Sequence, residues 1–235
     1  MIGIAIPAHN EAQHIVQTLQ SVQRSIVHYG QPALVVVVAD ACTDATVGLA
    51  RPLVDHIIET DARDVGTARA LGAQWLLAQG VQWLACTDAD SLVPSDWLSL
   101  QSQFQQQMQC DVFCGIVKVD DWGDFSPEVI KAFHATEPQD GHPHIHGANL
   151  GISRNAYELA GGFRPAYAHE DVALVRRCEA LGLRIVRLVQ PSVVTSARRT
   201  PRAREGFGDF LLKLERTVQQ YSTSPLHASS TSSAK

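Results

Sequence analysis

An unbroken apolar segment near the start of the chain most restricts the folds open to it. Residues 33–39 contain only alanine, leucine and valine, with no polar side chain at odd or even positions. Because successive side chains of a strand point to opposite faces, such a strand must be buried on both sides, which is typical of a parallel sheet covered by helices. The segment ends at Asp40, where the strand would leave the core.

Strand-like and helix-like segments alternate through the first half of the chain. Further strands are predicted at residues 2–7, 54–59 and 81–86. Apolar spacing predicts helices that begin near Asn10, near Thr43 or Asp44, at Gly66 and after a Ser95 cap, with Glu11 in the first turn of the first helix. This alternation indicates a doubly wound α/β fold, in which ligands bind at the carboxyl ends of the strands.

Two aspartates, Asp88 and Asp90, follow the strand at 81–86. On an extended backbone, residues two apart point to the same side, so these carboxylates would face one ligand. Carboxylate oxygens suit hard cations such as Mg²⁺ or Mn²⁺, which are often shared with nucleotide phosphates. Two aspartates at this spacing, with no other signal, usually belong to a solvent-exposed turn. Asn10, Glu11 and Asp40 are predicted at the same edge of the sheet, and this grouping favours a ligand site.

The second half has a more mixed pattern. Strands are predicted at 111–119, 183–188 and 191–195, a short helix at 155–159, and a helix that opens at Glu170 and ends at Gly182. His142, His144 and His146 alternate after an acidic stretch at 120–141. His144 and His146 would share a face and bind a metal, or would line a loop facing a second substrate.

Composition limits the other possibilities. The chain has 235 residues and a net charge of -5, which argues against nucleic acid as a main partner. Its five scattered cysteines indicate free thiols in a reducing compartment, and Cys110 and Cys114 lack the second pair that a zinc site needs. Neither a leader nor an apolar run of about 20 residues is visible, so a cytoplasmic protein is expected. We expect one domain over 1–221, with a nucleotide-binding half at 1–110 and an acceptor-side half at 111–221, and a disordered tail at 222–235.

Two features of the second half have open interpretations. The basic segment at 198–216 begins with Arg198 and Arg199, which would clamp a diphosphate or an acidic acceptor, dock on a membrane surface, or form a solvated face. Trp122 would stack on a sugar or belong to a core or a lid.

About residues 1–190 resemble a family 2 glycosyltransferase with the GT-A fold, a Rossmann-like, mostly parallel sheet flanked by helices. The resemblance depends on the order and intervals of several short motifs rather than on any one of them. These are Ile6 to Glu11, Asp40 with Thr43 and Asp44, Gly66 to Gly72, Asp88 to Asp90, Gly147 to Asn149, Gly161 to Phe163, and His169 to Asp171.

The resemblance implies a role for each matching residue on the sugar-donor side. Pro7, Ala8 and Glu11 would line the nucleotide, and Asp40 would accept a hydrogen bond from the base, most often uracil in this family. Arg69 would contact the nucleotide or its phosphates. Asp88 would lean towards the ribose or the sugar, and Asp90 would ligate the metal with Asp88 beside it.

On the acceptor side, Asp171 matches the family's catalytic base. Glu170 would orient the site beside it, or would only favour the start of the helix. A cation offsets the charge of a diphosphate leaving group, and a base takes the proton of the attacking hydroxyl. The helix dipole should keep Asp171 ionised with a normal or lowered pKa. One base and direct attack predict an inverting, metal-dependent enzyme with a nucleotide-diphospho-sugar, and the family favours UDP.

Two alternatives stay open beside the transferase. A nucleotidyltransferase would carry a glycine-rich basic loop after its first strand, whereas this chain has His9 and Asn10 there. A silent nucleotide-sugar-binding protein would have lost Asp90 or Asp171. The absence of a Gln-x-x-Arg-Trp motif favours a single-transfer, non-processive enzyme. The sequence identifies neither the sugar nor the acceptor, which would be a saccharide, a lipid-linked molecule or a small molecule, and it does not give the oligomeric state.

Overall fold

The computed structural model describes residues 1–136, 138–199 and 206–223. The chain divides into two compact units, one of Met1–Asp120 with Pro138–Ser196 and one of Asp121–Glu137 with Ala197–Lys235. The single domain expected over 1–221 stays a prediction. The predicted tail begins inside a helix that continues to Thr223, and its residues 224–235 lie outside the described residues.

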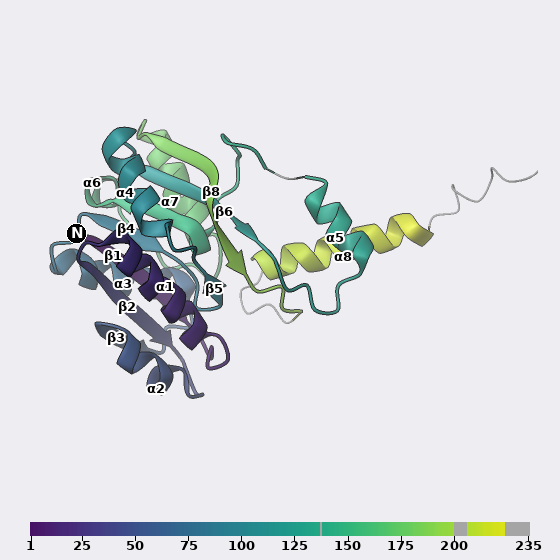
Figure 1. Ribbon diagram of the computed structural model, residues 1–235, viewed down its shortest axis with the longest axis horizontal. Coiled ribbons are helices and arrows are strands. Elements are labelled where there is room, and N and C mark those ends of the chain that lie inside the picture. The colour runs from purple at the N-terminus through teal and green to yellow at the C-terminus, as the bar shows by residue number, and fades with distance from the viewer. Residues whose placement is uncertain (137, 200–205, 224–235) are drawn as a thin grey trace, which may run out of the picture. The chain divides into compact units, whose positions relative to one another are not determined.

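An eight-stranded mixed sheet forms the centre of the first unit, with the strand order β3-β2-β1-β4-β7-β6-β8-β5 (Figure 1). The predicted α/β class is therefore confirmed. The strands are β1 (Ile2–Ala8), β2 (Ala33–Asp40), β3 (His56–Thr60), β4 (Trp83–Cys86), β5 (Ser91–Leu92), β6 (Val112–Lys118), β7 (Leu150–Ser153) and β8 (Ile185–Thr195).

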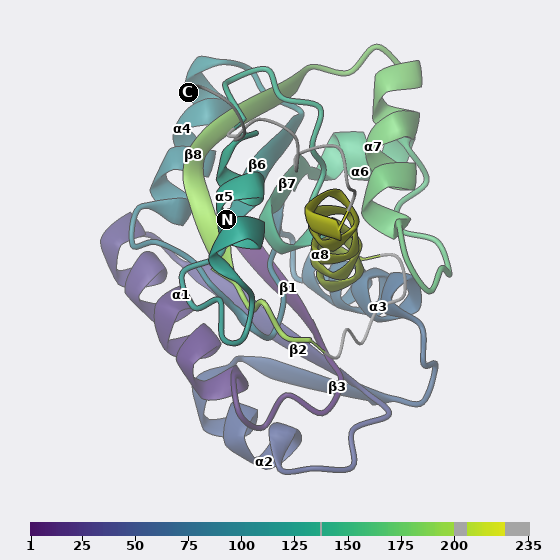
Figure 2. The ribbon, with the colours of Figure 1, turned by 90° about the vertical axis from the view of Figure 1, so that its right-hand side faces the viewer.

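Helices cover both faces of this sheet (Figure 2), which explains why β2 is apolar at every position from Ala33 to Ala39. Val35 and Val37 of β2 point into one core and Val36 and Val38 into the other. The first core is closed by α1 (Ile15–Tyr29), α2 (Thr46–Ala50) and α4 (Trp97–Gln107), with the 3₁₀ turn η1 (Arg51–Leu53) beside it. The second is closed by α3 (Val65–Ala78), α6 (Arg154–Leu159) and α7 (Glu170–Ala180).

The sheet changes direction between β4 and β7. Strands β3, β2, β1 and β4 are parallel, whereas β7 is antiparallel to both β4 and β6. In an antiparallel pair the start of one strand lies beside the end of the other. The short 3₁₀ turn η2 (Gly147–Asn149), which leads into β7, therefore lies at the carboxyl end of β4, where Asp88 follows.

Several predicted boundaries were wrong. The first helix begins at Ile15 rather than near Asn10, because the Asn10 side chain accepts hydrogen bonds from the backbone of Thr43 and Asp44 instead of capping its own helix. The helix after β4 begins at Trp97, and Ser95 is not its cap. The two strands predicted at 183–188 and 191–195 are one strand, β8, with an irregular register against β6 between Gly115 and Val117. Sequence analysis missed β5, β7, α5 (Pro127–His134) and α8 (Phe207–Thr223).

A buried asparagine joins three elements of the first unit. Asn149 is fully buried, its Nδ2 donates to the carbonyl oxygens of Ile116 (2.9 Å) and Pro191 (2.8 Å), and its Oδ1 accepts from Trp97 Nε1 (2.9 Å). These three bonds use both N–H donors of the Asn149 amide and one of the two lone pairs of its oxygen. Asn149 therefore ties β6, β8 and α4 to the turn that precedes β7.

Replacing Asn149 with alanine should lower the free energy of unfolding by about 2–4 kcal/mol, because it leaves buried polar groups without partners. Urea denaturation would measure the change. Asn155→Ala, at an exposed position of α6, is the matched control and should be nearly neutral. A loss below about 1 kcal/mol at Asn149 would mean that the three hydrogen bonds are readily replaced.

The second unit consists of α5, α8 and the residues before each helix. Trp122 makes edge contacts with Phe125 and Phe133, and Phe133 contacts Phe207 and Phe210 of α8. The guanidinium of Arg199 lies over the Phe125 ring and donates two hydrogen bonds to Glu215. Trp122 and Arg199 thus help hold this unit together. No helix among the described residues is both long enough and apolar enough to cross a bilayer.

Candidate active site

Asp88 and Asp90 lie in a turn directly after β4. The backbone N–H of Ser91 donates to the carbonyl of Asp88 at 3.2 Å, so the extended backbone assumed from the sequence was wrong. Both side chains are partly exposed. As hard oxygen ligands they fit Mg²⁺ or Mn²⁺. Within the described ranges, no group of three His, Cys, Asp or Glu residues is placed to hold a metal, so further ligands would have to come from water or a bound diphosphate.

A buried arginine connects Asp88 to the second half of the chain. Arg69, on α3, donates from Nη2 to Asp88 Oδ1 (2.5 Å) and from Nε to Glu170 Oε1 (2.8 Å). The Arg69 side chain is 3% exposed and that of Glu170 is 6% exposed. Burial favours the neutral form of Arg69, but the charges of Asp88 and Glu170 outweigh it and raise its pKa. Arg69 therefore remains a cation between carboxylates.

Asp171 is held by two backbone N–H groups. Gly147 donates to Asp171 Oδ2 (2.6 Å), and Val172 donates to Oδ1 (2.7 Å). Burial raises the pKa of the Asp171 carboxyl, although Arg69 and these two hydrogen bonds oppose the rise. The expectation of a normal or lowered pKa from the helix dipole was therefore wrong, because desolvation exceeds the effects that favour the charged form.

Gly147 lies between this carboxylate and the arginine. A Cβ atom at Gly147 would lie 2.4 Å from Arg69 Nη2 and 2.9 Å from its Cζ. Only glycine allows the backbone to pass this close to the guanidinium. Gly147 therefore contacts the Arg69 guanidinium through its Cα and donates a hydrogen bond to the Asp171 carboxylate through its backbone N–H.

Asp40, at the end of β2, is buried and holds the loop before α3. Its Oδ1 accepts from the backbone N–H of Arg63 and its Oδ2 from that of Asp64, both at 2.8 Å. A cleft of about 250 Å³ opens beside it, and its lining includes Cys42, Thr43, Thr60, Asp61 and Arg63. The predicted contact between Asp40 and a base stays a prediction.

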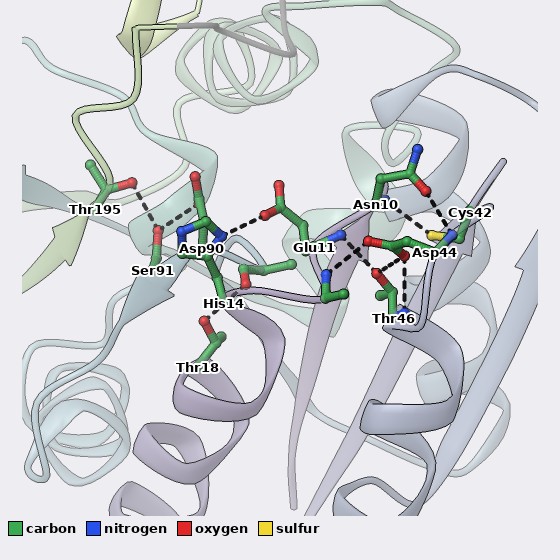
Figure 3. A network of polar contacts seen from close by, with 12 residues as sticks. Asn10, Glu11, His14, Thr18, Cys42, Asp44, Thr46, Asp90, Ser91 and Thr195 are labelled. Atoms are coloured by element: carbon green, nitrogen blue, oxygen red, sulfur yellow. Dashed lines mark hydrogen bonds and ion pairs between the residues drawn. The ribbon is translucent and has the colours of Figure 1, made fainter.

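A polar network at the end of β1 fixes Asn10 and Glu11 (Figure 3). Glu11 is buried, its N–H donates to Thr46 Oγ1 (2.7 Å), and its Oε2 pairs with His14 Nδ1 (3.1 Å). Asp44 accepts from the N–H of Ala12 and from that of Thr46 (both 3.0 Å). Pro7 and Ala8 close β1 immediately before this network. The first βα turn is thereby tied to the second.

The three alternating histidines form a column of neighbouring rings, tilted between His142 and His144 and nearly parallel between His144 and His146. The ring centres of His142 and His144 lie 5.6 Å apart, and those of His144 and His146 lie 5.8 Å apart. His142 Nε2 lies 3.2 Å from the carbonyl of Leu188, and its Nδ1 is buried without a hydrogen-bond partner among the described residues. The rings of His144 and His146 lie nearly parallel, with 14° between their planes, and their predicted binding of a metal stays a prediction.

The histidine column should make stability sensitive to acid. Burial lowers the pKa of His146 to about 4. The folded state therefore resists a proton that the unfolded chain accepts below its ordinary pKa of about 6.5. Stability is complete above that pH and falls as the pH drops towards 4, by up to about 3 kcal/mol.

Urea denaturation between pH 7 and 4 would test this. His146→Asn should flatten the fall, whereas His28→Asn, at an exposed position of α1, should leave it unchanged. An equal fall in the wild type and in His146→Asn would contradict the prediction.

Among the predicted site residues, the structure brings Arg69, Asp88, Glu170 and Asp171 into one connected group. Asn10 and Glu11 form a separate group with the start of α2, and Asp40 anchors the loop before α3. Sequence reasoning did not identify the role of Gly147 or of Asp64, which caps α3 through Thr67 (2.6 Å) and accepts from Ala166 (3.1 Å). The available signals were the glycine itself at Gly147 and, for Asp64, an aspartate directly before the first residue of α3.

Solved structures with the same fold place the chain in a known class. Residues of this chain superpose on TarS 1-349 from S. aureus in complex with UDP-GlcNAc with a TM-score of 0.66 and 15% identity, covering 92% of this chain and 66% of that one. The mannosyltransferase PcManGT from Pyrobaculum calidifontis, in complex with GDP-Man and Mn²⁺, superposes with a TM-score of 0.64 and 17% identity, and the match covers 97% of this chain and 76% of that one. Glucosyl-3-phosphoglycerate synthase from Mycobacterium tuberculosis superposes with a TM-score of 0.59 and 18% identity, and the match covers 93% of this chain and 77% of that one. The fold is therefore the GT-A fold of glycosyltransferases.

The family follows from the sequence match itself. The model of glycosyl transferase family 2 matches residues 3–164, more than half of the chain, and the chain belongs to this family. A search of curated proteins found no match. The chain spans slightly less than two thirds of TarS 1-349 and 38% of the longer TarS chain. Family membership confirms the resemblance and disfavours both a nucleotidyltransferase and a silent binding protein.

Proposed function

We propose that the chain is an inverting, metal-dependent glycosyltransferase that moves a sugar from a nucleotide-diphospho-sugar to an acceptor hydroxyl. The observation that carries the proposal is the meeting of Asp88, after β4, with Asp171, at the start of α7, around one buried arginine and one glycine. The residue proposed to face the sugar donor and the residue proposed to take a proton are thus parts of one connected set of contacts.

Asp171 acts as the general base. The N–H groups of Gly147 and Val172 orient its carboxylate, and burial raises its pKa so that it binds a proton more readily than an exposed aspartate. The acceptor oxygen forms a bond to the anomeric carbon as the bond to the diphosphate breaks, and the hydroxyl proton passes to Asp171. Attack opposite the leaving group inverts the anomeric carbon.

Asp90 and Asp88 would hold a divalent cation. When bound, such a cation offsets the negative charge of the diphosphate leaving group. Support comes from the hard oxygen ligands of the two residues and from the Mn²⁺ in the complex of PcManGT. The cleft beside Asp40 would take part of the nucleotide. Pro7, Ala8 and Glu11, which do not line this cleft, would contact the nucleotide from the end of β1.

The sugar donor is UDP-linked in this proposal. TarS binds UDP and UDP-GlcNAc, whereas PcManGT binds GDP-Man, so the choice of UDP follows the more general preference of the family. The acceptor class, a non-processive single transfer, peripheral contact with a membrane through 198–216, and a cytoplasmic location remain predictions from the sequence.

Calorimetry of nucleotide binding tests the proposal. UDP, GDP and dTDP are titrated into the protein with and without Mn²⁺, and UDP should bind in a metal-dependent manner. Transfer from the matching nucleotide-sugars to saccharide, lipid-linked and small-molecule acceptors is then screened, and the anomeric configuration of the product is read by NMR. Binding of none of the three nucleotides would overturn the proposal.

A further inference from the structure

We propose that Arg69 and Glu170 are positioning residues that touch neither substrate, and that they couple the aspartate of the sugar-donor side to the base. The inference rests on the proposed function for its catalytic part. It differs from the role that the family resemblance implies for Arg69, which is contact with the nucleotide or its phosphates. For Glu170 it selects one of the two expectations, a part in orienting the site, and names Arg69 as the residue through which Glu170 acts.

The two side chains are buried too deeply to reach a ligand. Arg69 is 3% exposed and Glu170 is 6% exposed, whereas Asp88, to which Arg69 is bonded, is 38% exposed. The aspartate therefore meets the solvent and any substrate, and the arginine supports it from behind. Burial raises the pKa of the Cys86 thiol to about 11. The nearby Arg69 charge opposes this rise, so Cys86 also lies close to the guanidinium.

The nitrogens of the guanidinium are occupied or enclosed. Nε donates to Glu170 and Nη2 to Asp88, while Nη1 is buried with no hydrogen-bond partner among the described residues. The Cα of Gly147 covers the guanidinium so closely that a methyl group would collide with it. A phosphate could reach Arg69 only if Gly147 or the other groups that bury the guanidinium moved.

The same contacts give the coupling its route. Glu170 fixes Arg69, and Arg69 fixes Asp88. A displaced guanidinium would also press on Gly147, whose N–H holds the carboxylate of Asp171. Loss of Glu170 should therefore disturb both the sugar-donor side and the base, although Glu170 itself binds nothing.

Rescue by a conservative variant separates positioning from catalysis. Glu170→Gln keeps an oxygen for Arg69 Nε–H, so kcat should fall by only about tenfold with little change in the KM for the sugar donor. Glu170→Ala removes the acceptor and should lower kcat by about 100-fold. Equal losses in the two variants, of the size expected for removal of a general base, would make Glu170 a catalytic residue and overturn the proposal.

A double-mutant cycle on stability tests the same contact without relying on turnover. Arg69→Met, Glu170→Gln and the double variant are unfolded in urea, and the coupling between the two changes is calculated. The matched control is Arg154–Glu158, which has the same Nε to Oε1 contact at 2.8 Å but is 36% and 52% exposed. The buried pair should change the unfolding constant through coupling at least about tenfold more than the exposed pair.

The two failures are distinguishable. Coupling no larger at Arg69–Glu170 than at Arg154–Glu158 would overturn the positioning role, whatever the activity. If the wild-type protein neither binds a nucleotide nor transfers a sugar while the coupling is large, the proposed function is wrong, and the two residues only support the fold, so their catalytic positioning is overturned with it.

Discussion

Replacing Asp171 with asparagine should lower kcat/KM for sugar transfer by about 10²–10⁴-fold, the usual contribution of a general base. Asparagine has almost the same shape but cannot take the acceptor proton, and one of its two polar atoms would be an amide nitrogen facing a backbone N–H donor. Nucleotide affinity should be nearly unchanged, because Asp171 is proposed to act on the acceptor and not on the nucleotide. Steady-state kinetics and calorimetry on the same preparations would measure both.

The control for this substitution is Asp55→Asn. Asp55 also accepts a hydrogen bond from a backbone N–H, that of Val35 at 2.8 Å, but at the start of β2. It should retain full activity. Because burial raises the pKa of Asp171, wild-type kcat/KM should rise with pH through a pKa above the ordinary aspartate range. Unchanged kcat in Asp171→Asn would show that another group takes the proton.

Asp90→Ala should remove the Mn²⁺-dependent part of nucleotide binding, a loss of about 100-fold or more in affinity. The variant removes a carboxylate that no other residue of the turn can replace in the same position. Weak, metal-independent binding through the cleft beside Asp40 should survive. Calorimetry with UDP, with Mn²⁺ present and absent, separates the two parts.

Asp96→Ala provides the matching loss of charge for that experiment. Asp96 precedes α4 six residues further on, and its side chain makes no capping hydrogen bond. The affinity of the Asp96→Ala variant for the nucleotide should equal that of the wild type. An Asp90→Ala protein that keeps metal-dependent binding would place the cation elsewhere.

The sequence predicted the parallel half of the fold well, because its two central strands, β1 and β2, have seven and eight residues and are apolar almost throughout. It failed at two short strands, and it also missed the 17-residue helix α8, which begins in the segment interpreted only by its basic charge. Strand β5 has two residues and β7 has four, and neither length produces a visible period. Asn10 was taken for a helix cap, but its backbone is left-handed with φ 54°, and its side chain serves the next βα turn. A local pattern cannot show which of two nearby backbones a side chain will bind.

The site shows the same division. Acidic residues after strands indicated Asp40, Asp88 and Asp90, because the ends of parallel strands share one edge. The bond between Arg69 and Glu170 joins residues 101 positions apart, and no spacing within the sequence indicates such a pair. The pKa of Asp171 was misjudged for a related reason, since burial depends on the second half of the chain folding over the first.

The antiparallel pairing of β4 with β7 has a consequence for the growing chain. When residues 1–110 have been synthesised, β3, β2, β1 and β4 are complete, but β7 is not yet made. Strand β4, whose four residues are all buried in the final structure, is then an apolar edge with unpaired backbone groups. Such an edge invites pairing with other chains, so a fragment that ends near residue 110 should aggregate, and residues 1–110 depend on the later strand β7 for protection of that edge.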